Sequence, residues 1–218
     1  MKKKQKSNLL IQITKFFSPI IIGFSIIIFV GFLMQESLRI KFWPLITAYF
    51  FPPLGKESVI PTGVGLGINP LVMALSIAFV DIVVELFLLW NYDLAKKIPI
   101  IGKFMIKVEK IGQSSSDKYS WIKPLRFIGI VLFVMVPFQG SGGLVGSILG
   151  RLFGMKPINT FFAIATGAII GCVLIAYFAE AIKSVFLKNF LLGLMIIIIL
   201  AIIGVMILIY RRSKKNNK

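Results

Sequence analysis

Four apolar runs in the sequence are each long enough to cross a lipid bilayer as a helix. They span residues 16–34, 71–90, 158–178 and about 185–210. The hydrocarbon core of a bilayer is about 30 Å thick and takes about 20 helical residues to cross. Because 57% of the 218 residues are hydrophobic and the mean hydropathy is +0.92, a soluble fold would have too little interior to bury them. The sequence therefore predicts an all-α membrane protein.

Two further apolar segments, about 43–68 and about 122–153, are interrupted near their middle. Prolines mark the interruptions: Pro52, Pro53 and, in the far arm, Pro61 in the first segment, and Pro137 in the second. Proline removes a backbone donor and clashes with the preceding turn, so we do not expect a continuous helix through either segment. Each arm has about ten to fifteen residues, which at 1.5 Å per residue is nearer half a bilayer than a whole one. We therefore predict two re-entrant hairpins, whose tips are enclosed by protein or face a watery cavity.

The charge of the chain is distributed in the way that sets membrane topology. The formal net charge is +17, from 25 Lys and Arg against 8 Asp and Glu. The basic residues form short clusters beside the apolar runs, which is typical of a polytopic membrane protein rather than of a nucleic-acid groove. If both hairpins return to their own side, most basic residues share one face. The positive-inside rule then predicts a plasma-membrane protein with both termini in the cytoplasm.

The hairpins and the helices that follow them form an internal repeat. Asn69-Pro70 and Lys156-Pro157 precede the second and third long runs, and proline suits the first turn of a helix. One hairpin enters from outside and the other from inside, so the repeat is inverted. We predict a single membrane domain, 1–218, of four transmembrane helices plus two oppositely oriented re-entrant hairpins. It consists of an N-terminal repeat (1–90), a basic cytoplasmic connector (91–120) and a C-terminal repeat (121–218), a plan that recurs in transporters.

Three acidic residues lie inside the apolar segments, where a charge costs roughly 2.5–3.5 kcal/mol on insertion scales. Glu57 follows the first break, and it is either a protonatable or ion-binding group or a cap on the second arm of the hairpin. Asp81 and Glu85 share a helical face with Ala74 and Ala78, so a neighbouring segment can approach them. They are either a proton or cation relay or half of a structural ion pair with Arg126 or Arg151.

The second break has a composition that can bind anions. Gln139, Gly140, Ser141 and Gly142 would leave backbone amides free to cradle an anionic head group, or the glycines would serve close packing alone. Two arginines, Arg126 and Arg151, flank this hairpin on its inner side. Arginine binds phosphate in a bidentate manner, but it also snorkels to lipid head groups, and both interpretations stay open.

The residue types that are missing exclude several chemistries. The sequence has no histidine and one cysteine, Cys172. An intrachain disulfide, a His/Cys metal site and a thiolate–imidazole pair are therefore excluded, and we expect neither an enzyme nor a cofactor. The expected partners are membrane lipids, with an anionic lipid as substrate and without nucleic acid. The sequence leaves open whether the chain forms a homo-oligomer.

Two motifs resemble the small multi-drug export protein family, which is grouped with the broader DedA superfamily. They are PPLGKESVIPTG at 52–63 and VPFQGSGGLVGS at 136–147, and the resemblance covers about residues 40–180. The resemblance implies paired re-entrant hairpins in a transporter-like architecture, with Glu57 at the position of the acid in the first hairpin. DedA-type relatives are implicated in moving phospholipids or polyprenyl-phosphate carriers across the bilayer, with proton coupling. They place arginine within the second motif, whereas Arg126 and Arg151 lie outside it here.

The leading functional hypothesis is therefore proton-coupled translocation of an anionic amphipathic lipid, such as a polyprenyl phosphate or a phospholipid. Glu57, Asp81 and Glu85 would handle the proton, and the second break with its two arginines would handle the phosphate. Export of small cationic or apolar drugs is one alternative, with the same acids as counter-charges. A lipid scramblase without coupling, or a structural membrane protein, is the other.

Overall fold

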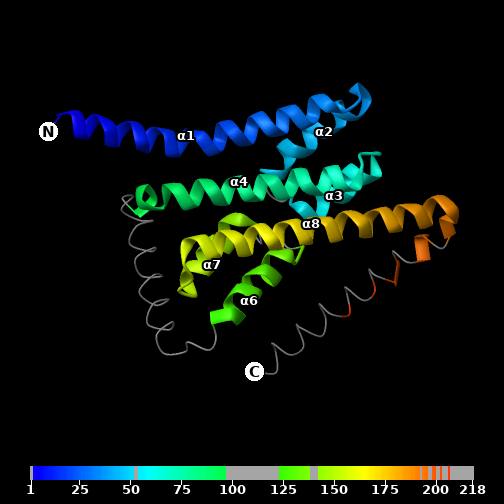
Figure 1. The fold of residues 1–218 in the computed structure, drawn as a ribbon. Coiled ribbons are helices and arrows are strands. Elements are labelled where there is room, and N and C mark those ends of the chain that lie inside the picture. The colour runs from blue at the N-terminus through cyan, green and yellow to red at the C-terminus, as the bar shows by residue number, and fades with distance from the viewer. Residues whose placement is uncertain are drawn as a thin grey trace. The chain divides into compact units, whose positions relative to one another are not determined.

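The computed structural model describes residues 2–51, 54–96, 123–137, 142–191 and 193–195, with single further positions at 198, 199, 202 and 206. Every regular element in these residues is a helix, as the all-α prediction requires. In chain order they are α1 (Lys2–Leu33), α2 (Glu36–Tyr49), α3 (Lys56–Gly65), α4 (Pro70–Lys96), α6 (Lys123–Met135), α7 (Gly143–Leu152) and α8 (Pro157–Lys188) (Figure 1). The chain divides into two compact units, Met1–Tyr177 and Phe178–Lys218.

Three of the four predicted spans are confirmed as helices long and apolar enough to cross a membrane. They are Gln12–Leu33, Pro70–Asn91 and Pro157–Lys188. The predicted end of the third span near residue 178 is wrong, because α8 continues to Lys188. Ala, Glu and Lys favour helix there, and Glu180 pairs with Lys183 one turn later at 3.8 Å. The predicted fourth span lies partly outside the described residues and stays a prediction.

The first interrupted segment is a pair of helices, α2 and α3. Its predicted start at residue 43 is wrong, since α2 already begins at Glu36, directly after the bend that ends α1. The interruption itself lies between Tyr49 and Lys56, as expected, while Pro52 and Pro53 lie outside the described residues. Pro61, predicted to mark a break, lies instead inside α3, which continues through it.

The second interrupted segment is a matching pair, α6 and α7. The helix α6 ends at Met135, Pro137 follows in the break, and α7 begins at Gly143 with Gly142 as its N-cap. The described part of the predicted segment of 122–153 thus consists of two helices with a break between them, and its re-entrant path stays a prediction. Gln139, Gly140 and Ser141 lie outside the described residues. The apolar span of α4 ends at Asn91, and the helix itself continues to Lys96 into the predicted connector of 91–120. Residues 97–122 are outside the described part, and the connector stays a prediction.

The second arm of each pair ends in the same turn. After α3 the turn residue is Gly67, with φ of 96°, and after α7 it is Gly154, with φ of 68°. Positive φ is a conformation that glycine adopts without steric cost, and it closes a helix C-terminus in the Schellman manner. Next come Pro70 and Pro157 as the first residues of α4 and α8, each three positions beyond its glycine. The two pairs of arms therefore end alike, in a glycine turn followed by a helix that begins with proline.

Each pair of arms is also held together at its base by the same kind of contact. The Lys41 ammonium on α2 donates to the main-chain carbonyl of Leu66, which caps α3, at 3.2 Å. The Arg126 guanidinium on α6 donates to the main-chain carbonyl of Phe153, which caps α7, at 2.8 Å. Carbonyls at a helix C-terminus lack intrahelical partners and carry partial negative charge, so a cation there stabilises the turn.

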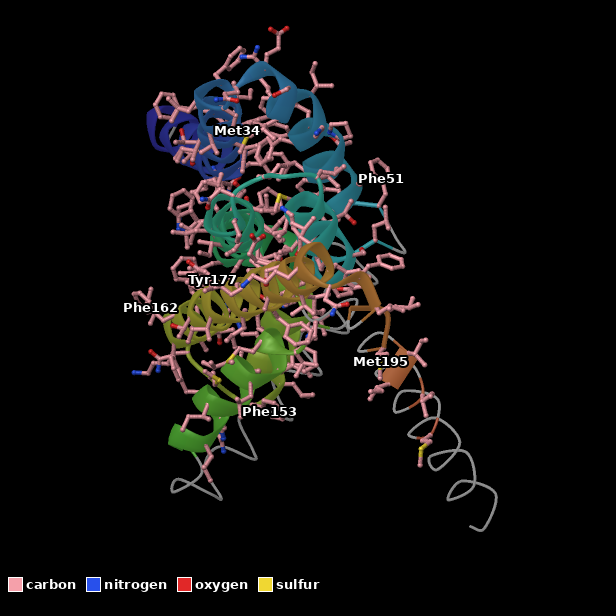
Figure 2. The ribbon with its side chains drawn as sticks, turned by 90° about the vertical axis from the view of Figure 1, so that its right-hand side faces the viewer. Met34, Phe51, Phe153, Phe162, Tyr177 and Met195 are labelled. Atoms are coloured by element: carbon pink, nitrogen blue, oxygen red, sulfur yellow. The ribbon has the colours of Figure 1, made fainter. Side chains whose placement is uncertain are left out.

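Small residues allow α8 to lie directly against α6. Thr160, Ala163, Gly167 and Gly171 form one face of α8, and all four are buried. A Cβ added at Gly171 would lie 2.8 Å from the Cα of Met135. In Figure 1, α4 and the part of α8 within the first unit run in opposite directions. Large apolar side chains such as Phe51 and Phe162 lie on the outside of the helices, as lipid contact requires (Figure 2).

Candidate functional site where the two breaks meet

A buried lysine joins the two interrupted segments. Lys56 is the first residue of α3, directly after the N-cap Gly55, and only 2% of it is exposed. Its ammonium donates to the main-chain carbonyl of Val134, in the last turn of α6. The tip of the first pair of arms therefore contacts the end of the first arm of the second pair. A lysine in apolar surroundings needs compensation, so this contact marks a constrained position.

Asp81 lies at the same junction, halfway along α4 and only 4% exposed. The Tyr49 hydroxyl, at the end of α2, donates to its Oδ1 atom at 2.7 Å. The backbone N–H of Gly143, at the start of α7, also donates to the carboxylate, and the Lys56 ammonium interacts with it electrostatically. The Asp81 carboxylate thus accepts hydrogen bonds from α2 and α7 and interacts with the positive charge at the start of α3. Its second oxygen, Oδ2, is buried and has no hydrogen-bond partner in the described part of the chain.

Glu85 binds α7 one turn further along α4. It is 2% exposed, and the Ser147 hydroxyl donates to its Oε2 atom. Arg151, one turn beyond Ser147, interacts with it electrostatically. The helices approach closely enough that a Cβ added at Gly143 would lie 2.8 Å from the main-chain oxygen of Asp81. The start of α7 therefore requires glycine, and both acids contribute to its position.

Glu57 lies at the tip of the first break, beside the cluster rather than within it. Its carboxylate folds back over Gly55, where an added Cβ would lie 2.5 Å from both of its oxygens. It occupies the first turn of α3, where free backbone N–H groups favour an anion. Its Oε2 atom is buried and unpartnered among the residues that the structure places. Glu57 also interacts electrostatically with Tyr49, so it belongs to the same region.

The structure brings together some of the residues singled out from the sequence and separates others. Asp81, Glu85 and Gly142 lie at the junction, with Arg151 acting on Glu85. Arg126 lies at the base of the second pair of arms instead, where its guanidinium donates to the main-chain carbonyl of Phe153.

Three residues of the cluster were missed in the sequence: Tyr49, Lys56 and Ser147. Lys56 stands directly before Glu57 in the sequence, and its position as the first residue of a helix after a glycine is the signal that could have found it. Tyr49 is the last residue before the break, and its hydroxyl reaches an acid 32 positions later. No pattern in the sequence connects it with Asp81.

Two cavities adjoin the helices, and both are apolar. One of about 570 Å³ lies among α1, α4 and α8, with Val30, Leu75 and Ile169 in its wall. The other, of about 220 Å³, lies among α1, α2 and α4 and includes Phe24, Phe50 and Val83. Within the described ranges, no group of three or more His, Cys, Asp or Glu is placed to hold a metal ion.

Apolar helices of membrane length, with buried charges at two interrupted segments, define a polytopic membrane protein. The chain belongs to the family described as Putative small multi-drug export protein, whose model matches residues 57–174. The matched region begins just after the first break and contains Asp81 and Glu85 on α4 as well as the second break. Together, the apolar helices and the family indicate a membrane transporter. A search of curated proteins and a search of solved structures each found no match.

Proposed function

We propose that this protein is a proton-coupled transporter that moves an anionic amphipathic lipid across the cytoplasmic membrane, with Asp81 as its proton-carrying group. The observation that carries the proposal is the position of Asp81. It is buried where the two interrupted segments meet, and one of its oxygens has no partner in the described residues. Ionisable groups at membrane depth are costly and mark ion pathways and proton relays.

A change in the charge of Asp81 acts on both pairs of arms at once. The carboxylate is held by Tyr49 from the first pair and by Gly143 from the second, with Lys56 nearby. A protonated carboxyl is a weaker acceptor than a carboxylate and no longer compensates the Lys56 ammonium. Uptake of a proton therefore loosens the contact between the two tips, which is the kind of step that alternating access requires.

The arrangement of the helices supports an inverted repeat of re-entrant hairpins. The two pairs of arms end in the same glycine turn and have equivalent cations at their bases, Lys41 and Arg126. Because α4 and the first part of α8 run in opposite directions, the two hairpins open toward opposite ends of the bundle (Figure 1). Transporters built on inverted repeats bind their cargo where discontinuous helices meet near the midplane.

An anionic lipid suits the chemistry of this junction. Lys56 is a buried positive charge, and an anionic head group compensates it when Asp81 is protonated. The cavity of about 570 Å³ among α1, α4 and α8 is lined by aliphatic and aromatic side chains that suit an acyl or prenyl chain. The resemblance to DedA-type proteins supports the same cargo, a polyprenyl phosphate or a phospholipid.

The test is lipid transfer between leaflets in proteoliposomes that carry a pH gradient. Fluorescently labelled phosphatidylglycerol should change leaflets faster with the protein than without it, and faster with the gradient than without it. Asp81→Asn should abolish the response to the gradient, because the amide cannot carry a proton. The matched control is Glu180→Gln, an acid-to-amide change at the half-buried i, i+3 pair with Lys183. An unchanged gradient response in Asp81→Asn would refute the role of Asp81.

Export of cationic or apolar drugs is the second candidate. The family description favours it, and Asp81 and Glu85 are suitable counter-charges for a cation. Measuring ethidium movement in the same vesicles distinguishes drug export from lipid transport. Gradient-driven movement of ethidium without movement of phosphatidylglycerol would replace the lipid by a drug-like cation. Lipid movement that ignores the gradient in the wild type would instead make the protein a scramblase.

A further inference from the structure

Pro19 interrupts the hydrogen bonding of α1 inside the span that is long enough to cross the membrane. Proline has no backbone N–H, so the carbonyl four residues earlier, that of Lys15, loses its usual intrahelical donor. The side-chain amide of Asn91, on α4, donates to this carbonyl at 3.1 Å and to the main-chain carbonyl of Phe87 at 2.9 Å. A neighbouring helix thus supplies the missing bond, which is how membrane helices tolerate an internal proline.

The helix α1 runs alongside α4 but is held firmly only before Pro19 (Figure 1). There, the Asn91 amide and the edge-to-face rings of Phe16 and Phe87, with centroids 5.2 Å apart, fasten it to α4. In all, 22% of the α1 span is buried against 44% of the α4 span, so α1 is the more loosely packed helix. Two buried polar atoms at the joint, Ser18 Oγ and Asn91 Oδ1, have no hydrogen-bond partner in the described residues. Because few bonds are lost when such a joint rearranges, Pro19 is suited to act as a hinge.

Beyond the hinge, α1 is packed with α2 as one unit. Residues 34–35 alone separate the two helices. A Cβ added at Gly31 would overlap the ring of Trp43, so the helices are in close contact there. The Arg39 guanidinium, on α2, also lies over the ring of Phe32, on α1, at 5.3 Å from its centroid. A movement of α1 beyond Pro19 therefore carries α2 with it.

We propose that this α1–α2 unit is a side gate that turns about Pro19 and admits the hydrocarbon chain of the transported lipid to the cavity of about 570 Å³ among α1, α4 and α8. This inference rests on the proposed function and adds to it the path of the chain and its control. Ile26 and Val30, both beyond the hinge, form part of the cavity wall, and Ile169 of α8 forms another part. The smaller cavity of about 220 Å³ among α1, α2 and α4 leaves room for the unit to move.

The hydrogen bond between Tyr49 and Asp81 is the latch of this gate. Tyr49 is the last residue of α2, and its hydroxyl donates to Asp81 Oδ1 at 2.7 Å, so the far end of the unit is fixed to α4. The Oδ2 atom has no donor within the described structure, and it can take up a proton without first breaking a bond. A protonated carboxyl is a weaker acceptor than a carboxylate, so proton uptake weakens the latch. Opening of the gate is thereby linked to the protonation of Asp81.

The remaining groups around the latch leave its strength to Asp81. Those that face Asp81 or Tyr49 from other helices are the Lys56 ammonium and the Glu57 carboxylate of α3, the Gly143 N–H of α7 and the Cys172 thiol of α8. On α4, Glu85 accepts from Ser147 and interacts with Arg151, both on α7. On α1, the one charged residue between positions 12 and 33 is Lys15, on the other side of the hinge. Asp81 is the acid to which Tyr49 donates, so its charge decides whether the latch holds.

The first test measures the distance between α1 and α8 in the full-length protein, purified in detergent. In a Cys172→Ala background, spin labels are attached at Phe29→Cys on α1 and Leu174→Cys on α8, two positions that are more than half exposed. Double electron–electron resonance should show this distance lengthening by several ångströms on acidification, and in Asp81→Asn at every pH. A label at Phe17→Cys, on α1 before the hinge, should keep its distance to Leu174→Cys. A Phe29–Leu174 distance that responds neither to pH nor to Asp81→Asn would overturn the gate.

The second test restores the backbone N–H that the hinge lacks. Pro19→Ala should raise the melting temperature in detergent by a few degrees yet slow lipid translocation severalfold, because a continuous helix does not turn at this point. Asn91→Ala should lower the melting temperature of the wild type, but by much less in the Pro19→Ala background, where the Lys15 carbonyl has a donor in its own helix. Pro44→Ala, the matched change inside α2, should leave translocation close to the wild-type rate. Translocation at the full rate in Pro19→Ala would refute the hinge.

The third test fills the cavity. Leu75 lies in the cavity wall, whereas Leu71 lies one turn earlier on α4 and outside the wall, and the two are equally accessible, at 43% and 42% exposed. Leu75→Trp should slow lipid translocation severalfold without changing the distances between the labels, and Leu71→Trp should leave the rate unchanged. Equal rates in the two tryptophan variants would remove the cavity from the path of the lipid.

These results also distinguish the gate from the proposed function. If the wild type translocates lipid under a pH gradient but the distance between α1 and α8 stays fixed, the gate is refuted and proton-coupled transport stands. If the distance changes as expected but the wild type moves no lipid between leaflets, the hinged movement stands and the transport proposal fails.

Discussion

The Lys56 ammonium, on the first turn of α3, donates to the main-chain carbonyl of Val134, in the last turn of α6. These residues lie 78 positions apart, one in each half of the predicted repeat. The bond therefore connects the tip of the first interrupted segment to the second. Because a cation and a helix C-terminus attract each other, the contact stabilises both helix ends in addition to joining them.

Loss of this bond should destabilise the junction and stop transport. In Lys56→Met the aliphatic stem is kept, but the Val134 carbonyl loses its donor and Asp81 loses the positive charge of Lys56. An unsatisfied buried acceptor costs about 1–3 kcal/mol, so the melting temperature in detergent should fall by several degrees. Lipid translocation in proteoliposomes should fall to the protein-free rate.

The control for that variant is Lys183→Met, which removes a lysine that pairs with Glu180 at the surface of α8. Surface ion pairs contribute about 0–1 kcal/mol, so stability and transport should stay close to those of the wild type. Equal losses of stability in both lysine variants would show that Lys56 has no special part in the fold.

The Tyr49 hydroxyl should set the pH range of transport. Tyr49→Phe removes a donor that binds the charged form of Asp81, so the protonated form is favoured and half-maximal transport should move to higher pH. The measurement is the initial rate of lipid translocation across a series of pH values. Tyr177→Phe, which removes the hydroxyl of an exposed tyrosine on α8, should leave the profile unchanged (Figure 2). An unshifted profile in Tyr49→Phe would argue that Asp81 does not titrate during transport.

The sequence was sufficient for those features that depend on local chemistry. Proline at the first helical position predicted the starts of α4 and α8. The start of α2 was missed because the polar residues 35–41 resemble a loop, although Glu36 suits a first helical turn. The repeat was visible in the prolines, but the matching turns at Gly67 and Gly154 required backbone geometry.

The site could be predicted only in part, for a physical reason. Buried acids such as Asp81 are conspicuous because charge is rare in an apolar run. Their partners are ordinary residues, Tyr49 and Ser147, which come from other helices and are brought close only by tertiary packing. Lys56 was overlooked because a lysine beside Glu57 suggests a local pair, whereas the structure directs it across to α6.

Close packing of α8 on α6 should be sensitive to a single methyl group. A Cβ at Gly171 would lie 2.8 Å from the Cα of Met135, so Gly171→Ala forces the helices apart at an expected cost of about 1–3 kcal/mol. Gly129, in α6, has no neighbour within 4 Å of its added Cβ, and Gly129→Ala should stabilise by up to about 1 kcal/mol through helix propensity. Thermal unfolding in detergent measures the change in stability of both variants. The same sign of change in both variants would contradict this packing.

The inverted orientation of the two hairpins should be visible from the accessibility of their base turns. Leu66 caps α3 and Phe153 caps α7, and both side chains are more than two-fifths exposed. In a Cys172→Ala background, which removes the only native cysteine, Leu66→Cys should react with a membrane-impermeant maleimide added to intact cells. Phe153→Cys should react only after the membrane is permeabilised, because in the proposed topology the second hairpin opens toward the cytoplasm. The two cysteines should differ in labelling if their turns lie at opposite faces of the membrane, since the bilayer blocks a charged reagent. Equal labelling of both cysteines from outside would mean that the two turns share one face, and the proposed inverted repeat would have to be abandoned.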